Sequence, residues 1–524
     1  MREVTIKVSR LNPETDERPV LKEYKVPCRD EDSVLGGLLH IYEEIDSTLL
    51  FHYWCRYRLC GKCAIRINGR PMLACETPLE DGMVLEPLDH LPVIRDLAVD
   101  RSGLLEPLRR NEILLPPGNQ VEAAIQPSEF YQLMRCNECL SCLSDCPVYG
   151  RKMGYDGPLF GARLAELHYD VRNPEGLLPR LDFYLDRCIL CKQCEVNCPW
   201  DLRFPEISTK IKGELFRQKK TSIRDWVMAR PEWVGRIASR LALPVNALSK
   251  KKAVRKVMDR VLKVDERAPF PDYCRGSVRP KQSRKGKGKV AYFLGCFDKF
   301  NDPKTAEASL DVLEANGLDV ELLDPGCCGA PFIGLGDLES ARKRALSLSG
   351  EIEEEVRHGH DIVLSCPSCA IMVKKEYPAL FHLLKGEVVK SRLFDLGDYL
   401  GRLHDAGAFE KRPKEIRKRI GYQVSCHLRA QNRGVPFLHL LKRVPGLEVA
   451  PLFNQCCGMA GTLGFKKEKF DLSQKVGEPL IESIRQSGLD LLLSDCASCR
   501  MKIGKEANVK TLHPIVILRE SLIS

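Results

Sequence analysis

Short alternations of apolar and polar residues dominate the first hundred positions of the chain. The stretches REVTIKVSR, LKEYKVP and AIRINGRPML have the period of two that predicts half-buried β-strands. Asn68-Gly69, inside the third stretch, predicts a hairpin turn. Between these strands, SVLGGLLHIYEEI has helical spacing behind a potential N-cap at Ser33. We therefore expect residues 1–105 to form a small sheet crossed by one helix.

The middle of the chain is predicted to be helical. Residues 106–225 contain helical patterns such as GARLAELHYDVR and EISTKIKGELFRQ around two cysteine runs. Residues 226–288 are basic, interrupted by proline and without strong periodicity. We expect this segment to be a connector that passes from helical to disordered.

From Lys289 onward the chain repeats itself. VAYFLGC, ending at Cys296, corresponds to IGYQVSC, ending at Cys426, and Cys-Cys-Gly recurs at 327–329 and 456–458. DIVLSCPSC likewise corresponds to DLLLSDCASC. Each unit alternates short apolar strands with longer helical patterns such as DLESARKRALSLSGEIEEEVR. The pattern predicts a duplicated α/β domain over 289–404 and 405–524.

The cysteine content is the unusual part of the composition. The 524 residues suggest several domains, and 44% hydrophobic and 29% charged residues are ordinary, but there are 24 cysteines. The start, MREVTIKVSR, lacks the apolar stretch of a signal peptide, and no apolar run approaches the roughly 18–20 residues that cross a bilayer. Tight C-x2-C spacings then favour metal ligation over disulfides. We predict a cytoplasmic, anaerobic protein without a transmembrane segment.

The net charge of +10 is concentrated locally, at Lys250–Lys252 and in the run KQSRKGKGK from Lys281 to Lys289. The second run is rich in glycine and lysine and has no apolar spacing, so we interpret it as a solvated linker. We expect no nucleic-acid partner.

Cys55, Cys60 and Cys63 form C-x4-C-x2-C, and Cys75 follows. This is the plant-type spacing of a 2Fe–2S cluster, whereas structural zinc sites more often use paired C-x2-C knuckles. The stretch STLLFHYWCRYRLCGKCAIRINGRPMLAC resembles the β-grasp N-terminal domain of succinate dehydrogenase and fumarate reductase iron–sulfur subunits. That family usually has glycine where this chain has Arg58, so we expect a change in loop conformation or cluster potential there.

Two cysteine runs in the middle of the chain have the spacing C-x2-C-x2-C-x3-C-P. In two-cluster ferredoxins the fourth cysteine of each run ligates the other cluster, and zinc is the alternative metal. The first predicted 4Fe–4S cubane is ligated by Cys136, Cys139, Cys142 and Cys198, and the second by Cys188, Cys191, Cys194 and Cys146. The succinate dehydrogenase family commonly lacks the cysteine found here at 191 and holds a 3Fe–4S cluster beside its quinone. The tail CPWDLRFPEISTKIK instead resembles the small ferredoxin-type subunit of heterodisulfide reductases.

The repeated half carries two five-cysteine sets, each with a vicinal pair. They are Cys296, Cys327, Cys328, Cys366 and Cys369, and Cys426, Cys456, Cys457, Cys496 and Cys499. Five cysteines are more than the four ligands of one tetrahedral metal ion. The alternative is a set of buried, unreactive thiols without a metal. Gly329 and Gly458 follow the pairs and would let the backbone turn close to a cluster.

This half resembles the CCG-domain family, and in particular the catalytic subunit of heterodisulfide reductase. The resemblance implies a noncubane 4Fe–4S cluster in each complete motif and disulfide chemistry between the two clusters. Many relatives in lactate and glycolate oxidation have one degenerate motif, whereas both are complete here. Substrates of the family are anionic, so we name as candidate substrate contacts Lys299, Arg429, Arg433, Lys466 and Lys467. Solvated surface cations are the alternative.

Three further residues near these motifs have no predicted ligand role. His427 adjoins Cys426, and a packed histidine is as well supported as a functional one. Cys28 and Cys274 are left over from the five motifs and are predicted to be unligated thiols.

The order of the modules resembles the iron–sulfur subunit of thiol:fumarate reductases, a family known from methanogenic archaea. The resemblance implies oxidation of coenzyme M and coenzyme B thiols to the heterodisulfide at the paired C-terminal clusters. Electrons would pass through the 4Fe–4S and 2Fe–2S clusters to a separate flavin subunit that reduces fumarate to succinate. The chain has no G-x-G-x-x-G fingerprint, so FAD is expected on that partner. The alternatives are an electron-transfer subunit of a succinate or 2-hydroxy-acid dehydrogenase, or of a heterodisulfide reductase complex, without its own substrate site.

Overall fold

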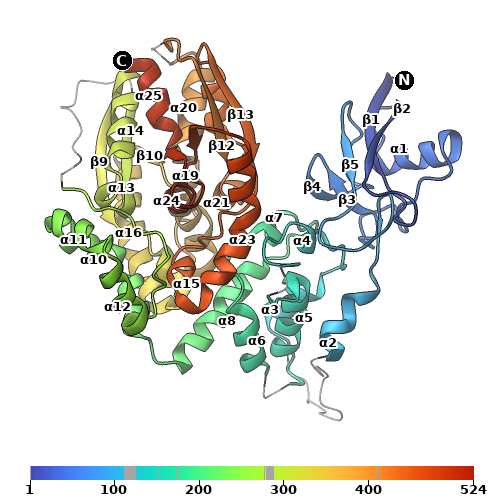
Figure 1. Ribbon diagram of the computed structural model, residues 1–524, viewed down its shortest axis with the longest axis horizontal. Helices are drawn as coiled ribbons and strands as arrows, with labels where there is room; N and C mark the ends of the chain where they lie inside the picture. Colours follow the sequence, from blue (N-terminus) through green and yellow to red (C-terminus); the bar gives the residue numbers. More distant parts are fainter. Residues whose placement is uncertain are drawn as a thin grey trace. The chain divides into compact units, whose positions relative to one another are not determined.

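The chain forms two compact units in the computed structural model, which describes residues 2–110, 125–151, 153–173, 176–275, 278, 288–409 and 412–523. The first unit contains residues 1–188 and 192–211, and the second contains 189–191 and 212–524 (Figure 1). Among the described helices, none has both the length and the apolar character of a bilayer span.

The first unit begins with a five-stranded mixed sheet. Its strands are β1 (Arg2–Arg10), β2 (Val20–Cys28), β3 (Ala64–Ile67), β4 (Arg70–Leu73) and β5 (Val84–Glu86), in the order β2-β1-β5-β3-β4. Asn68 and Gly69 have φ values of 50° and 77°, as the predicted hairpin turn requires. Helix α1 (Val34–His40) begins at Ser33, whose Oγ accepts the N–H of Gly36 at 3.2 Å. The predicted sheet with one crossing helix is therefore present.

A two-stranded sheet of β6 (Val93–Arg95) and β7 (Ala98–Val99) follows, and the rest of the first unit is helical around the two cysteine runs. Its helices are α2 (Glu106–Arg110), α3 (Ser128–Met134), α4 (Ser141–Ser144), α5 (Gly157–Tyr169), α6 (Leu178–Leu185), α7 (Gln193–Val196) and the first part of α8 (Phe204–Gln218). The buried Tyr184 hydroxyl donates to the carbonyl of Gly157 at 2.6 Å. A Cβ on Gly161 would lie 2.2 Å from the Tyr184 ring, so glycine permits the close packing of α5 on α6.

The second unit contains two four-stranded parallel sheets. One has the order β11-β10-β8-β9 and the other β13-β12-β14-β15. The repeat relates β8–β11 to β12–β15 in turn, so the second order is the first one read from the opposite edge of the sheet. The strands are β8 (Gly288–Gly295), β9 (Leu318–Gly326), β10 (Asp361–Leu364), β11 (Leu393–Asp395), β12 (Lys418–Gln423), β13 (Leu447–Phe453), β14 (Leu491–Leu493) and β15 (Lys510–Leu512). The predicted duplicated α/β architecture is confirmed, as is the multidomain α+β and α/β fold class.

Helices flank the two parallel sheets. They are α13 (Cys296–Phe300), α14 (Pro303–Ala315), α15 (Ala330–Leu335), α16 (Leu338–Arg357), α17 (Pro367–Ile371), α18 (Tyr377–Phe381), α19 (Glu387–Ser391), α20 (Leu396–Asp405), α21 (Cys426–Arg429), α22 (Pro436–Leu441), α23 (Lys467–Gln486), α24 (Ala497–Glu506) and α25 (Pro514–Ile523). One buried apolar cluster includes Leu310 of α14, Ile420 of β12 and Leu518 of α25. The two halves of the repeat therefore share a core.

The predicted basic connector contains more regular structure than its sequence indicated. Four short helices, α9 (Ile223–Met228), α10 (Pro231–Arg240), α11 (Ala242–Ser249) and α12 (Lys252–Leu262), follow one another. Pro231 and Pro244 lie in the first turns of α10 and α11, where proline costs no intrahelical hydrogen bond. The run from Lys281 to Lys287 lies outside the described residues. The domain boundaries drawn from the sequence stay predictions.

Candidate iron–sulfur centres

The loop before β3 directs backbone N–H groups at cysteine sulfurs. Cys55 Sγ accepts the N–H groups of Tyr57 at 3.4 Å and Cys60 at 3.2 Å, and Cys75 Sγ accepts that of Arg58 at 3.3 Å. Burial raises the pKa of Cys55, but these N–H groups outweigh it and bring that pKa to about 7. A loop that stabilises thiolates fits the four-cysteine donor set of a 2Fe–2S cluster.

Arg58 lies within the loop, at the position where the sequence resemblance led us to expect glycine. Its φ of 64° lies in the left-handed region, which glycine adopts without steric cost. Its guanidinium pairs with Glu76 at 2.8 Å, donates to the carbonyl of Pro199, and lies 5.7 Å from the ring centroid of Trp200. Arg58 therefore adopts a left-handed backbone conformation and links the loop to the residues that follow Cys198, and its effect on cluster potential stays a prediction.

The structure brings together the predicted ligands of the first cubane. Cys142 interacts electrostatically with Cys139, Cys136 and Cys198, and burial raises its pKa well above the usual range. Burial also raises the pKa of Cys136 to about 11. A buried thiol with a raised pKa loses its proton only when a nearby cation stabilises the thiolate. Iron bound by the four predicted ligands of this cubane would supply that positive charge.

Three predicted ligands of the second cubane gather around the buried Tyr184. Its hydroxyl interacts electrostatically with Cys188, Cys146 and Cys194. Burial raises the pKa of Cys146 to about 12. The fourth predicted ligand, Cys191, belongs to the second unit, where it interacts electrostatically with Cys426.

The 2Fe–2S loop contacts the loop of the first cubane within the first unit. Asn137 Nδ2 donates to the carbonyls of Arg58 at 3.4 Å and Leu59 at 3.3 Å. Gly61 has a φ of 65°, and a Cβ there would lie 2.7 Å from Cys139 Cβ. Only a glycine allows the two ligand loops to approach this closely.

Arg101 is a residue between these loops that the sequence did not single out. Its guanidinium donates to the carbonyl of Glu138, and its charge interacts with Cys139 of one site and with Cys60 and Cys63 of the other. Burial lowers the pKa of Arg101, and the neighbouring thiolates oppose that shift. Nothing in its spacing from the motifs marks it in the sequence.

The cysteines of the repeated half follow the carboxyl ends of parallel strands, where α/β proteins place their sites. In the first half Cys296 follows β8, Cys327 and Cys328 follow β9, and Cys366 follows β10. Their thiols form a chain in which each interacts with the next, in the order 296–327–328–369–366. The second half has the same order, 426–456–457–499–496, with 3.1 Å between Cys457 Sγ and Cys499 Sγ.

The two predicted turn glycines have equivalent roles. Gly329 and Gly458 have φ values of 79° and 78°. Their N–H groups donate to Cys327 Sγ at 3.4 Å and Cys456 Sγ at 3.3 Å. Each vicinal pair therefore turns sharply and receives a backbone donor.

The two five-cysteine motifs lie beside each other in the second unit. Ser368, between two cysteines of the first motif, has its Oγ 2.8 Å from Nδ1 of His427, which follows Cys426. Lys375 Nζ donates to the carbonyl of Ala430 at 2.6 Å. These contacts cross from one half of the repeat to the other, so the motifs form a paired site.

Different cations surround the two motifs. Arg344 Nε donates to the carbonyl of Cys327 at 2.5 Å, and its charge acts on that thiol. In the second half Lys502, 1% exposed, donates to Ser473 Oγ at 2.6 Å and interacts electrostatically with Cys456 and Cys457. The position equivalent to Lys502 in the first half is Met372. Arg344 and Lys502 were missed because only the folded chain brings them to the cysteines.

The five candidate substrate contacts differ in their surroundings. Lys299 pairs with Asp324, Lys467 with Asp259, Arg433 with Asp398 at 2.6 Å, and Lys466 with Asp225 at 2.8 Å. Arg429 differs from these four because its charge acts on the thiol of Cys456. Of the five, Arg429 therefore has the best support, from its electrostatic interaction with a motif cysteine.

The two cysteines outside the motifs bond to the backbone. Cys28 Sγ donates to the carbonyl of Arg29 at 3.2 Å, and Cys274 Sγ to that of Asn301 at 3.5 Å. Their lack of a ligand role stays a prediction.

Family models match three parts of the chain. The model described as "2Fe-2S iron-sulfur cluster binding domain" matches residues 5–106, and "4Fe-4S dicluster domain" matches 132–202. The model described as "Cysteine-rich domain" matches 290–374 and again 420–504. The fold and these matches define a multi-cluster iron–sulfur protein with a duplicated CCG half.

Full-length relatives narrow the class further. The chain is 28% identical to a subunit of the fumarate reductase (CoM/CoB) of Methanothermobacter marburgensis, covering 98% of this chain and 97% of that one. It is 33% identical to a subunit of the anaerobic glycerol-3-phosphate dehydrogenase of Escherichia coli K12, covering 74% of this chain and 98% of that one. The chain belongs to this family of oxidoreductase iron–sulfur subunits, which confirms the family indicated by the motifs.

A solved structure shares the fold. The crystal structure of a hypothetical protein from Helicobacter pylori superposes with a TM-score of 0.53 at 12% identity, covering 100% of this chain and 95% of that one.

Proposed function

We propose that this chain is the iron–sulfur subunit of a thiol:fumarate reductase. Two thiols, those of coenzyme M and coenzyme B, are oxidised at the paired five-cysteine site. A sulfur–sulfur bond forms, two protons are released, and two electrons enter the chain. On a flavoprotein partner that carries FAD, the electrons and two protons reduce fumarate to succinate.

The observation that carries the proposal is the pairing of two complete motifs. Ser368 Oγ lies 2.8 Å from Nδ1 of His427, and this contact joins the ligand loops of the two motifs. Two substrate sulfur atoms, one bound at each motif, would therefore be neighbours. The full-length similarity to a fumarate reductase (CoM/CoB) subunit supports the same substrates. Arg344 and Lys502 carry positive charge beside the motif cysteines, and this supports binding of thiolate substrates there.

The proposed cofactors are one 2Fe–2S cluster, two 4Fe–4S cubanes and two noncubane 4Fe–4S clusters. Their ligands are the 22 cysteines in the motifs described above. When bound, the clusters supply one-electron carriers and iron that stabilises thiolate sulfur. The chain's contribution is to hold the ligand loops close together, as at Gly61 with Cys139 and at Cys191 with Cys426.

The exposed surface beside the 2Fe–2S loop fits the flavoprotein partner. Trp54, Tyr57 and Leu59 are 81%, 80% and 63% exposed around Cys55. Aromatic side chains of this kind are enriched at protein interfaces. We place the docking of the flavoprotein at this loop and the complex in the cytoplasm.

The test is anaerobic addition of coenzyme M and coenzyme B to the oxidised chain while the cluster absorbance is followed. Bleaching that needs both thiols is expected. Cys328→Ser and Cys457→Ser should abolish it, with the 2Fe–2S signal still reducible by dithionite, whereas Cys274→Ser should respond like the parent. Iron-loaded protein that dithionite reduces but the two thiols do not would contradict the proposal.

A second candidate function rests on a different similarity. The chain covers 98% of an anaerobic glycerol-3-phosphate dehydrogenase subunit at 33% identity. In that case the chain relays electrons from a separate dehydrogenase subunit and oxidises no thiol. Rapid cluster reduction by a co-purified dehydrogenase and its substrate, without any thiol response, would establish this alternative.

A further inference from the structure

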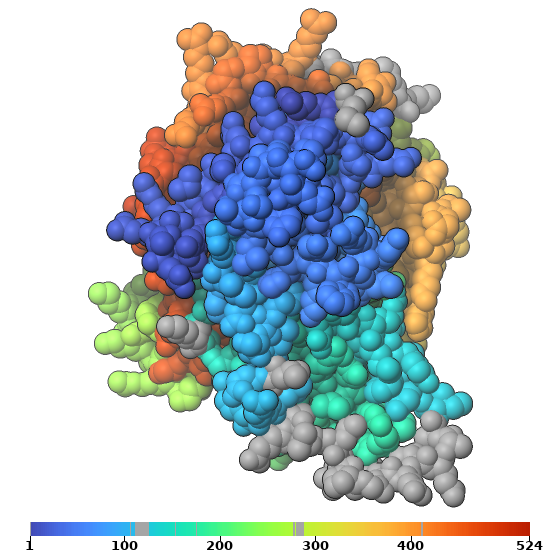
Figure 2. All heavy atoms as spheres, turned by 90° about the vertical axis from the view of Figure 1, so that its right-hand side faces the viewer, coloured from blue at the N-terminus to red at the C-terminus, as the bar shows by residue number. Residues whose placement is uncertain are grey.

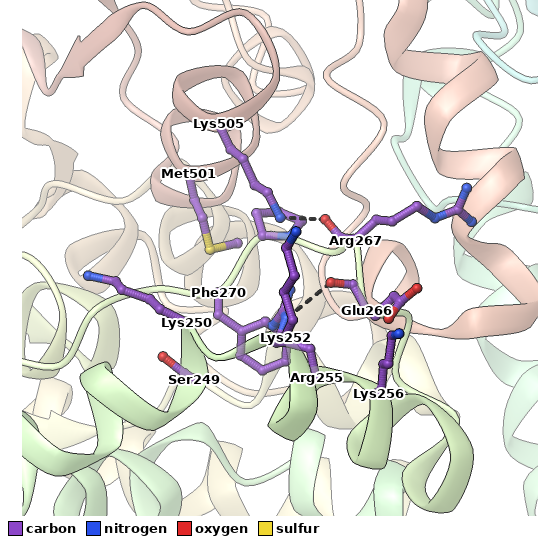
Figure 3. Close-up of a pocket in the computed structure, with 11 residues that line it drawn as sticks. Ser249, Lys250, Lys252, Arg255, Lys256, Glu266, Arg267, Phe270, Met501 and Lys505 are labelled. Carbon is purple, nitrogen blue, oxygen red and sulfur yellow. Dashed lines mark hydrogen bonds between the residues drawn. The ribbon is translucent and has the colours of Figure 1, made fainter.

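A basic cavity of about 710 Å³ lies in the second unit between α12 and α24 (Figure 3). Its cationic lining residues are Lys250, Lys252, Arg255, Lys256, Arg267 and Lys505, and Glu266 is a carboxylate of its wall. Small-molecule sites in proteins occupy about 300–1,000 Å³. The cavity therefore has room for an organic ligand.

The cavity uses the helix that carries part of the second five-cysteine motif, but a different face of it. Met501 and Lys505, four residues apart on α24, line the cavity. The helical period places Cys499 on the other side of α24, where its thiol interacts with that of Cys457. The cavity is therefore a site of its own and not part of the paired site for thiols.

Arg255 is a buried cation of this cavity, 8% exposed, that is held by neutral groups. Its Nε donates to the carbonyl of Glu266 at 3.1 Å, its Nη2 donates to the carbonyl of Ala268, and its guanidinium lies 4.1 Å from the Phe270 ring centroid. Its buried Nη1 has no hydrogen-bond partner among the described residues. Since burial of an uncompensated charge is costly, this arrangement favours an anion in the cavity.

Three lysines of the cavity also lack a counter-charge. Lys252, Lys256 and Lys505 form no ion pair with the described residues, whereas the other two cationic lining residues pair with aspartates. Burial lowers the pKa of Lys505, and the neighbouring charge of Arg255 lowers it further. These four cations against Glu266 leave a net charge of +3 (4 minus 1). A bound anion would relieve their mutual repulsion.

Helix α12 begins at the cavity. Ser249, Lys250 and Lys252, which precede or open this helix, belong to the cavity lining. Lys251 is the N-cap residue, and its side chain makes no capping hydrogen bond. The positive end of the helix dipole therefore adds to the charge of the side chains, and both favour a phosphate group.

The cavity also has an apolar wall. Pro269, Phe270 and Met501 line it together with the cations. In Figure 3, Met501 and Lys505 extend from α24 toward Phe270 and Lys252 on the opposite side. Figure 2 shows the connector helices, in light green, at the surface, where a ligand can arrive from solvent. Cations beside apolar side chains suit an organic phosphate better than an inorganic anion.

We propose that the cavity between α12 and α24 binds a soluble organic diphosphate of the size of a nucleoside diphosphate. Its phosphates lie against Lys252, Lys256 and Lys505, and its organic part lies against Phe270 and Met501. A nucleoside diphosphate carries about three negative charges at neutral pH, which matches the net charge of the cavity. This inference does not depend on the identity of the thiols or of the electron acceptor.

The test is anaerobic isothermal titration calorimetry of the full-length, iron-loaded protein with ADP, in the absence of magnesium. We expect binding of one ADP per chain, with an affinity that falls as salt is added. AMP, which carries less charge, should bind at least fivefold more weakly, and adenosine should not bind. Pyrophosphate should also bind at least fivefold more weakly than ADP, because it leaves the apolar wall uncovered.

Variants of both walls locate the ligand. Lys252→Glu with Lys256→Glu should weaken ADP binding at least tenfold, and Lys505→Met, on the opposite wall, at least threefold. The matched control is Lys7→Glu with Lys25→Glu, which makes the same charge change in the first unit, at side chains that are 44% and 72% exposed. All variants should keep the parent's iron content and thiol response, which separates this test from that of the proposed function.

Three results would overturn the proposal. The first is the absence of ADP binding at millimolar concentration. The second is an ADP affinity that the cavity variants leave unchanged, or that the control lowers equally. The third is pyrophosphate binding as tight as that of ADP, which would mean that the cavity recognises an inorganic anion only.

Discussion

Ser368 Oγ lies 2.8 Å from Nδ1 of His427, and this hydrogen bond joins the two five-cysteine motifs. Ser368 stands between Cys366 and Cys369, and His427 directly follows Cys426. The contact thus connects ligand loops of both halves and helps to set the distance between them.

Replacing His427 by alanine should slow thiol oxidation without removing a cluster ligand. Loss of one such hydrogen bond costs roughly 1 kcal/mol, so we expect the bleaching rate to fall about five- to tenfold. Stopped-flow absorbance with both thiols measures it. His439→Ala is the control, because His439 bonds to the exposed Asp405 at 3.2 Å. A normal rate in His427→Ala would show that the contact does not position the motifs.

Gly61→Ala should impair electron transfer between the 2Fe–2S site and the first cubane. The new Cβ would lie 2.7 Å from Cys139 Cβ and 2.9 Å from Asn137, so the two ligand loops must separate. Freeze-quench EPR after reduction should show delayed appearance of the reduced 2Fe–2S signal, by tenfold or more.

Gly82→Ala supplies the matched control for this prediction. Gly82 also has a positive φ, 76°, but no atom lies within 4 Å of the position of its Cβ. Backbone strain is therefore similar in both variants, and only Gly61→Ala introduces a clash. An equal delay of the 2Fe–2S signal in both variants would show that backbone strain causes it, and not the clash between the two ligand loops.

The sequence predicted those features that depend on local pattern. The strand β1, the cap at Ser33 and the turn at Asn68-Gly69 follow from spacing over a few residues, and the structure contains them. Parallel strands that end in cysteines also explain why the five-cysteine sets could be recognised. Tertiary contacts could not be predicted in this way. Lys502 reaches its cysteines only after α24 packs against Ser473.

The connector shows a second limit of pattern analysis. Each of its helices has at most 11 residues, too few turns for a strong periodic signal, and prolines in first turns resemble helix breakers. The sequence also does not show which face of α10 is exposed, because that depends on the tertiary packing of Gly235 on Phe300.

Lys502→Met should lower the reduction potential of the cluster in the second motif. The substitution removes a buried cation that interacts with Cys456 and Cys457, and reduction adds negative charge there. A loss of about 1 kcal/mol corresponds to roughly 40 mV for a one-electron couple. Redox titration followed by EPR measures the shift. Lys505→Met, an exposed lysine on the same helix, should leave the potential within about 10 mV.

Glu232→Gln should have the opposite effect on the first motif. Glu232 of α10 accepts the N–H of Cys327 at 3.1 Å, so its carboxylate places negative charge beside the site. An amide oxygen can still accept that hydrogen bond, and we expect the potential to rise by tens of mV with normal iron content. Glu339→Gln, at an 80% exposed side chain, is the control. An unchanged potential in Glu232→Gln would show that solvent and the ion pair with Arg236, at 2.5 Å, screen the carboxylate.

The repeated half keeps one sulfur order but has lost the symmetry of its surroundings. Lys502 in one half corresponds to Met372 in the other, and Arg344 has its counterpart in Ser473. A perfectly symmetric pair of motifs would accept two unlike thiols in either arrangement with equal affinity. With unequal charges, exchanging the two ends of a bound pair changes its energy. The duplication has thus produced a site with a built-in direction.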